Sequence, residues 1–156
     1  MSTKNFNLIL FFILLFFIIF GIQGEKVQVN SGLGWDGLGF SETIKNLNAT
    51  NTPGTDVYST QRILPFILVW IISKVFNFSL DNQNIVSSFL ILNSALILIS
   101  FYFWNKITTF YNFDKKIKTI SFFAIFLNYA ILKMTFHYPV LTDMAAFILE
   151  AVKICG

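Results

Sequence analysis

Long apolar runs without a single charged residue limit the folds that this chain can adopt. Residues Phe6 to Ile22 form one such run, and residues Ile85 to Trp104 form another. A helix needs about 20 apolar residues to cross a bilayer, because the hydrocarbon core is about 30 Å thick. Only 12% of the residues are charged, whereas soluble domains carry about 25%. The sequence therefore predicts an all-α fold, a polytopic helical membrane protein.

Hydropathy divides residues 1–156 into four to five hydrophobic segments and one long polar loop. We expect a single integral membrane domain that is incomplete, since the last segment stops before it reaches the length of a span. The polar loop, residues 23–61, is expected on the outer face. The hydrophobic segments are residues 6–22, a first span; 63–78, a short segment; 85–104 and 119–136, two spans; and 144–155, the start of a further segment.

The first apolar run has two interpretations. It is longer than the apolar core of a signal peptide, which has about 7–15 residues, and Gly21 to Gly24 is a weak cleavage site. We therefore favour an uncleaved span. Lys4 precedes this span and no cationic cluster follows it, so the positive-inside rule places the N-terminus inside.

The stretch from Asn105 to Lys118 distinguishes two topologies, because it carries four lysines and one acid. If every apolar run crosses the membrane, this stretch lies outside, against the positive-inside rule. If residues 63–78 re-enter the membrane or lie along its interface, the stretch lies inside. His137 to Asp143 then lies outside, on the same face as Asp36. We favour this second topology, because residues 63–78 are short for a span.

Composition narrows the partners and the location. The formal charge of +3 is too small to indicate nucleic-acid binding. The single cysteine, Cys155, cannot form an internal disulfide, and a single histidine excludes a multi-histidine metal site. We expect membrane lipid as a partner and a bacterial inner membrane as the location, with several crossings.

Asp36 is the first candidate for chemistry. Glycines at positions 34, 37 and 39 surround it, and glycine lets the backbone approach a ligand closely. A carboxylate in this setting can act as a general base, or it can hold a divalent cation together with a phosphate. The alternative is an Asp-Gly turn between two spans, which is a common structure.

Four further residues are candidates for substrate binding. Arg62, at the start of a hydrophobic segment, suits a phosphate but also suits an interfacial anchor. Lys133 and His137 are four residues apart and share a helix face, where they can neutralise a phosphate; Lys133 can also extend to the interface. Asp143 can bind substrate or cap the following helix. Asn93 and Asn128 are polar residues within predicted spans, and we expect them to form interhelical hydrogen bonds.

The order of several short motifs resembles the N-terminal part of the polytopic GT-C glycosyltransferases, which use sugars linked to lipid phosphates. An acid in the outer loop is followed by an aromatic residue and then by an arginine at the start of the next hydrophobic segment. The matching residues are Trp35-Asp36-Gly37, Tyr58, Gln61-Arg62-Ile63-Leu64-Pro65, Asn93 and Leu141-Thr142-Asp143. Two features depart from the family: Leu38-Gly39-Phe40 replaces the usual Tyr-Tyr, and family members have more spans.

The resemblance implies a sugar transfer from a polyprenyl-phosphate donor on the outer face. It implies that Asp36 is the catalytic base or helps to hold a divalent metal, and that Arg62 contacts the lipid phosphate. A lipid-linked sugar is then a partner beside the membrane lipid itself. The alternatives are a small non-catalytic accessory or assembly subunit, and a part of a polysaccharide polymerase or flippase.

Overall fold

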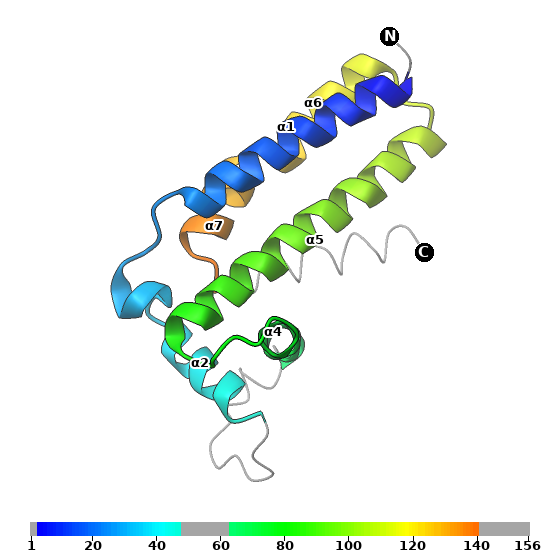
Figure 1. Cartoon of the computed structure of the whole chain (residues 1–156). Helices are drawn as coiled ribbons and strands as arrows, with labels where there is room; N and C mark the ends of the chain where they lie inside the picture. Colours follow the sequence, from blue (N-terminus) through cyan, green and yellow to red (C-terminus); the bar gives the residue numbers. More distant parts are fainter. Residues whose placement is uncertain (1–2, 48–62, 141–156) are drawn as a thin grey trace.

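The computed structural model describes residues 3–47 and 63–140, and within these two ranges the chain is helical and has no strand (Figure 1). This confirms the all-α expectation for the described part of the chain. The predicted segment 144–155 lies outside it. The elements in order are α1 (Thr3–Gln23), η1 (Val29–Gly32), α2 (Gly37–Lys45), α4 (Ile63–Val75), α5 (Asn82–Phe110), α6 (Lys115–Phe126), η2 (Ala130–Met134) and α7 (Thr135–His137).

Two of these helices are long and apolar enough to cross a membrane. They cover Asn5–Gln23, with a mean hydropathy of 2.6, and Asn82–Phe110, with a mean hydropathy of 2.0. Lys115–Phe126 and Ile131–His137 meet at a bend of 45° and together would make a third span. The chain is thus a helical membrane protein by the length and composition of its helices. Two or three candidate spans in the described ranges are fewer than the four to five hydrophobic segments predicted.

The α1, α5 and α6 helices lie side by side and run in alternating directions (Figure 1). The ring of Phe11, early in α1, lies 5.9 Å from the ring of Phe101, late in α5. Trp104 Nε1 donates to Ser121 Oγ of α6 at 3.2 Å. The start of α1, the end of α5 and the start of α6 therefore share one end of the bundle, here named the lysine end. The end of α1, η1, α2 and α7 share the other, here named the loop end.

Aromatic rings fill the space between α5 and α6. Phe101 and Trp104 of α5 contact Phe122 and Phe126 of α6, with ring centroids 5.8 to 6.1 Å apart, and all four side chains are buried. Lipid tails are as apolar as these side chains, so close van der Waals packing, and not water exclusion, holds helices together in a bilayer. This aromatic cluster therefore sets how the two helices fit.

The α4 helix lies across the loop end and does not extend the bundle. Figure 1 shows α5 lengthwise and α4 nearly end-on. Phe66 and Val69 of α4 are fully buried, and the ring of Phe66 lies 5.0 Å from that of Phe40 in α2. Ser73 also hydrogen-bonds Ser88 of α5 at 2.9 Å. The 13 residues of α4 reach only about 20 Å at 1.5 Å per residue, too short for a span.

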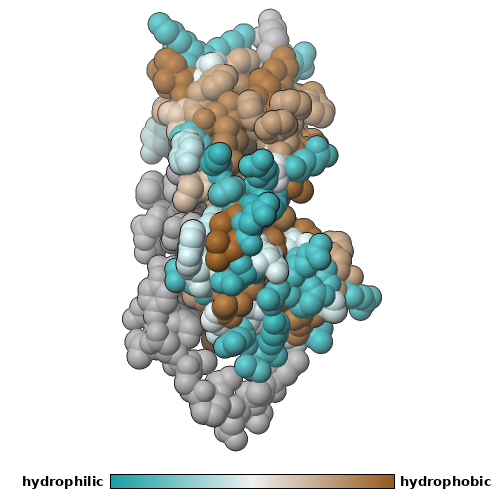
Figure 2. Space-filling view, turned by 90° about the vertical axis from the view of Figure 1, so that its left-hand side faces the viewer, coloured by the Kyte–Doolittle hydropathy of each residue, from teal (hydrophilic) through white to brown (hydrophobic). Residues whose placement is uncertain are grey.

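Hydrophobic and hydrophilic residues separate along the bundle. Figure 2 shows a brown hydrophobic band over the upper part of the molecule, with teal hydrophilic residues at its tip and over much of the lower part. The upper band covers the region of α1, α5 and α6, and the lower part is the loop end. The predicted polar loop 23–61 is thus in part folded, since η1 and α2 lie within it.

Polar side chains close the helix ends. Asp81 precedes α5 and accepts the backbone N–H of Asn84 at 2.9 Å, and Asp114 accepts that of Ile117 before α6 at 2.7 Å. Lys26 Nζ donates to the carbonyls of Gly21, Ile22 and Gly24 at the end of α1, at 3.2, 2.6 and 2.8 Å. These bonds satisfy backbone groups that a helix leaves free at its ends.

Replacing the cap of α5 tests this description. The Ser79 hydroxyl and then the Asn84 amide donate to Asp81 and lower the pKa of its carboxyl. Stabilisation by the carboxylate is present above the ordinary Asp pKa of about 4 and is lost as the pH falls through the lower folded value. We expect Asp81→Ala to lower the free energy of unfolding in detergent at pH 7, and to abolish this acid dependence. The exposed Glu42→Ala control should change neither; equal losses would contradict the cap.

Candidate functional site

A turn at the loop end presents Asp36. Gly34 has a φ of +73°, and a Cβ atom built on it would lie 1.9 Å from the hydroxyl oxygen of Tyr138. No residue but glycine fits there without moving the tyrosine. The side chain of Asn30, itself at a φ of +52°, closes the turn by donating to the carbonyl of Gly34 at 2.7 Å. The turn thus depends on Gly34 and on the side chain of Asn30.

Tyr138 holds this turn against a distant part of the chain. The backbone N–H of Trp35 donates to the Tyr138 hydroxyl at 2.7 Å, across 103 residues of sequence. The two rings also stack, with centroids 6.2 Å apart and an angle of 13° between their planes. Asp36 is the next residue, exposed and positioned just before α2, where its side chain makes no capping hydrogen bond. Its carboxylate is therefore left for another partner.

Lys133 and His137 line one cavity at the same end of the bundle, with a volume of about 300 Å³. Lys133 lies on η2 and is exposed, and His137 ends α7 and is half-buried. The expectation that the two residues share a face is met. The cavity is lined by Phe20, Gly21, Gly24, Glu25, Leu132, Lys133, Phe136 and His137.

Hydrogen bonds fix the orientation of the His137 ring. Its Nδ1 lies 3.0 Å from the backbone carbonyl of Glu25. A carbonyl only accepts, so Nδ1 carries the proton, and Nε2 of the neutral ring is left as an acceptor. The backbone N–H of Val27 donates in turn to the carbonyl of His137 at 2.9 Å. The segment after α1 is thus joined to α7 by two bonds.

Lys26 follows Glu25, which lines this cavity, but the Lys26 ammonium donates to carbonyls at the end of α1. Its three hydrogen bonds to the end of α1 are described above, and burial lowers the pKa of its ammonium. Lys133, by contrast, makes no hydrogen bond or ion pair to any residue in the described ranges. Lys133 is therefore the cation that remains available to a ligand at this cavity.

Asn93 of α5 holds α7 and the residue pair that follows it in place. It is buried in α5, and its Nδ2 donates to the carbonyls of Pro139 and Thr135 at 2.8 and 3.3 Å. This bears out the expected interhelical role of Asn93. Asn128 acts locally instead: its Nδ2 donates to the carbonyls of Ala124 and Ile125, and its Oδ1 accepts the N–H of Ile131. The prediction for Asn128 was wrong, because its bonds join two sides of the bend after α6.

The remaining candidates divide by position. Arg62 and Asp143 lie outside the described residues. Among the residues that are described, no group of three or more His, Cys, Asp or Glu side chains can hold a metal ion. A divalent cation at Asp36 would therefore need further ligands from a phosphate. Sequence reasoning missed Tyr138, because nothing in the spacing of residues links it to Trp35.

The fold and this site define the chain as a helical membrane protein whose one end combines a fixed acidic turn with a cationic cavity. No protein-family model, curated protein or solved structure matches it. What the chain does is therefore argued from the geometry of the loop end.

Two glycines in the same stretch provide a matched test of the turn. Gly34→Ala places a methyl group against Tyr138 at a backbone conformation that alanine resists. Gly39→Ala adds the same group where no atom lies within 4 Å. We expect Gly34→Ala to increase the rate of limited tryptic cleavage after Lys26 and Lys45 on the order of tenfold, since 1.4 kcal/mol shifts a local opening equilibrium by that factor. Gly39→Ala should leave the rate unchanged; similar rates in both variants would contradict the contact.

Proposed function

We propose that this chain binds the lipid phosphate of a polyprenyl-phosphate sugar at its loop end and takes part in transferring that sugar, as in the GT-C glycosyltransferases that it resembles. The contact of Tyr138 with Trp35 carries the proposal. It joins the turn that presents Asp36 to the segment that bears His137 and Lys133. An uncommitted carboxylate and an uncommitted ammonium thereby belong to the same end of one bundle.

The cavity suits an amphiphile with a phosphate. Phe20, Leu132 and Phe136 supply an apolar wall, and Lys133 and His137 supply hydrogen-bond donors and charge. Prenyl units can pack on the wall while phosphate oxygens meet the Lys133 ammonium. By the resemblance, Arg62 would be a further phosphate contact, and Asp143 a further polar contact with substrate.

The proposed reaction is a displacement at the anomeric carbon. Asp36 accepts the proton of an acceptor hydroxyl as that oxygen attacks the sugar. The bond between the anomeric carbon and the phosphate oxygen breaks, and its electron pair leaves with the lipid phosphate. Lys133 faces the negative charge that develops there. No step is assigned to a divalent metal, because the described residues do not supply a set of ligands for one.

We infer the orientation from the two ends of the bundle. The lysine end carries Lys106, Lys115 and Lys116 and is assigned to the inside by the positive-inside rule. The loop end then faces outward, and the N-terminus is inside. The α4 helix, lying across the loop end, supports the re-entrant or interfacial assignment of residues 63–78. The proposed location is a bacterial inner membrane, which the chain crosses several times within its predicted four to five hydrophobic segments.

Substitution of Asp36 tests the transfer step. We expect Asp36→Asn to lower the transfer of radiolabelled hexose from polyprenyl phosphate in membranes by about 10²- to 10⁴-fold, the usual contribution of a general base. Binding of the lipid donor should be retained, because the phosphate contacts lie elsewhere. Glu42→Gln, at another exposed acid of the loop end, is the control and should transfer at the rate of the unchanged chain.

Two results would separate the alternatives. Equal transfer by Asp36→Asn and the unchanged chain would refute the role of Asp36. Donor binding that depends on Lys133 without any transfer by the unchanged chain would favour a non-catalytic accessory subunit over the enzyme.

A further inference from the structure

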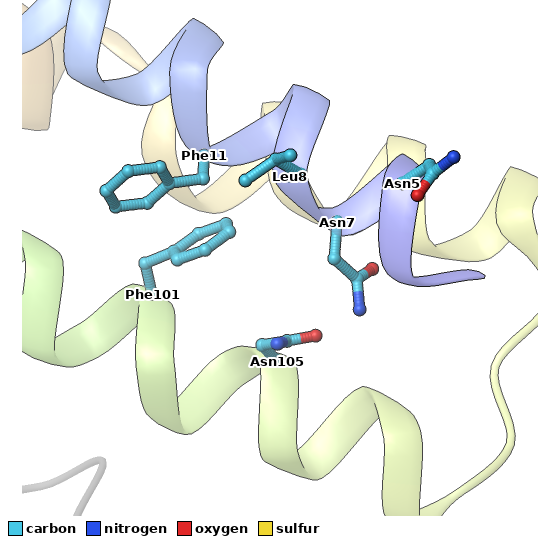
Figure 3. A pocket seen from close by; sticks show the side chains of 6 residues that line it. All are labelled: Asn5, Asn7, Leu8, Phe11, Phe101 and Asn105. Carbon is cyan, nitrogen blue, oxygen red and sulfur yellow. The ribbon is translucent and has the colours of Figure 1, made fainter. Parts of the chain in front are cut away.

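A second pocket lies at the opposite end of the bundle from the proposed sugar-transfer site. It has a volume of about 470 Å³ and opens between the start of α1 and the end of α5 (Figure 3). Its lining is divided into an apolar part and a part made of carboxamides. The lining residues are Asn5, Asn7, Leu8, Phe11, Phe101 and Asn105.

Two carboxamides in this pocket lack partners. Asn7 and Asn105 approach each other from facing helices (Figure 3), and the Oδ1 atom of each is buried without a hydrogen bond to any described residue. A buried acceptor left unpaired destabilises the folded chain. Each carboxamide also carries an NH₂ group, and these groups are donors. The pocket thus fits a ligand that has both hydroxyl groups and anionic oxygens.

A buried ammonium lies at the same end of the bundle, on α6, outside the lining of this pocket. Lys118 of α6 is 2% exposed, and its Nζ reaches Thr109 Oγ1 at a long 3.4 Å. Thr109 follows Asn105 by four residues, and therefore shares its face of α5. No carboxylate within the described ranges pairs with Lys118, since Asp114 caps the backbone of α6. Buried charges are normally paired, so this ammonium favours a counterion.

The surroundings indicate where such a counterion comes from. Phe110 and Tyr111 are 79% and 66% exposed at the end of α5, as is typical of aromatic residues at a membrane interface. The Lys106 ammonium lies 5.0 Å from the Tyr102 ring centroid, and Lys116 is exposed. This end is cationic and interfacial, which attracts anionic phospholipids.

We propose that the lysine end binds one anionic phospholipid with a hydroxylated headgroup. Its phosphate pairs with Lys118 and accepts from the NH₂ groups of Asn7 and Asn105. Its headgroup hydroxyls donate to the two unpaired Oδ1 atoms, and an acyl chain packs along Phe11 and Phe101. The site differs from the loop-end cavity in both position and ligand, so either can fail without the other.

Lipid quenching of Trp104 tests this site, because Trp104 precedes Asn105 and is buried in the adjoining aromatic cluster. Trp35→Phe and Trp70→Phe leave it as the only tryptophan. The full chain is placed in vesicles with phosphatidylglycerol or phosphatidylcholine brominated in the acyl chains. We expect a preference for phosphatidylglycerol of about fivefold, corresponding to one lysine near the headgroup, and a saturating response at a low fraction of that lipid.

Two lysines that differ in burial give the matched control. Lys118→Met and Lys116→Met remove the same charge, but only Lys118 is buried. We expect Lys118→Met to remove the preference and Lys116→Met to keep most of it. The Asn7→Leu, Asn105→Leu double variant should also lose it, which provides a second measurement if Lys118→Met does not fold.

Three outcomes would overturn the proposal. Equal loss in Lys116→Met and Lys118→Met would indicate diffuse attraction by the cationic surface. An unchanged preference in both Lys118→Met and the double asparagine variant would exclude these side chains as the site. Full competition by millimolar inorganic phosphate would indicate a site for a free anion, without a role for the lipid.

Discussion

Aromatic packing within the bundle is the constraint on which the rest of the structure depends. The Phe101 ring contacts Phe11 of α1 and both Phe122 and Phe126 of α6. In lipid, shape and not water exclusion determines how helices associate. These rings join three helices that alternate in direction, so the molecule has a lysine end and a loop end (Figure 1). Every polar feature described above belongs to one of these two ends.

The loop end is then held by a few polar contacts made over long sequence distances. Asn93 fixes the carbonyls of Thr135 and Pro139, and Tyr138 fixes the turn before Asp36. These contacts organise a carboxylate and a cationic cavity without using either for stability. The lysine end is organised differently, since its carboxamides and the Lys118 ammonium are left without full partners.

The sequence predicted those features that depend on local composition. Charge-free apolar runs predicted α1 and α5, and a spacing of four residues predicted that Lys133 and His137 share a helix face; both line one cavity. The re-entrant or interfacial assignment of residues 63–78 stays a prediction, and the position of α4 across α5 depends on tertiary packing of Phe66 and Val69.

Features that depend on pairing of distant residues could not be predicted from this sequence. Nothing near Trp35 indicates that its amide binds a tyrosine 103 residues later. In the sequence, Asn93 and Asn128 are both polar residues within predicted spans. The bonds of Asn128 are local because the backbone bends after α6. The loss of helical hydrogen bonding at that bend is a tertiary effect. Arg62 and Asp143 remain predictions of the sequence.

The central claim, that the two ends face opposite sides of a membrane, is tested most directly by cysteine accessibility. In a Cys155→Ser background, Gln28→Cys marks the loop end and Tyr111→Cys marks the lysine end, both at exposed positions. An impermeant maleimide added to intact cells should label position 28 at once and position 111 only after the membrane is opened. Labelling of both positions in intact cells, or of position 111 alone, would contradict the account.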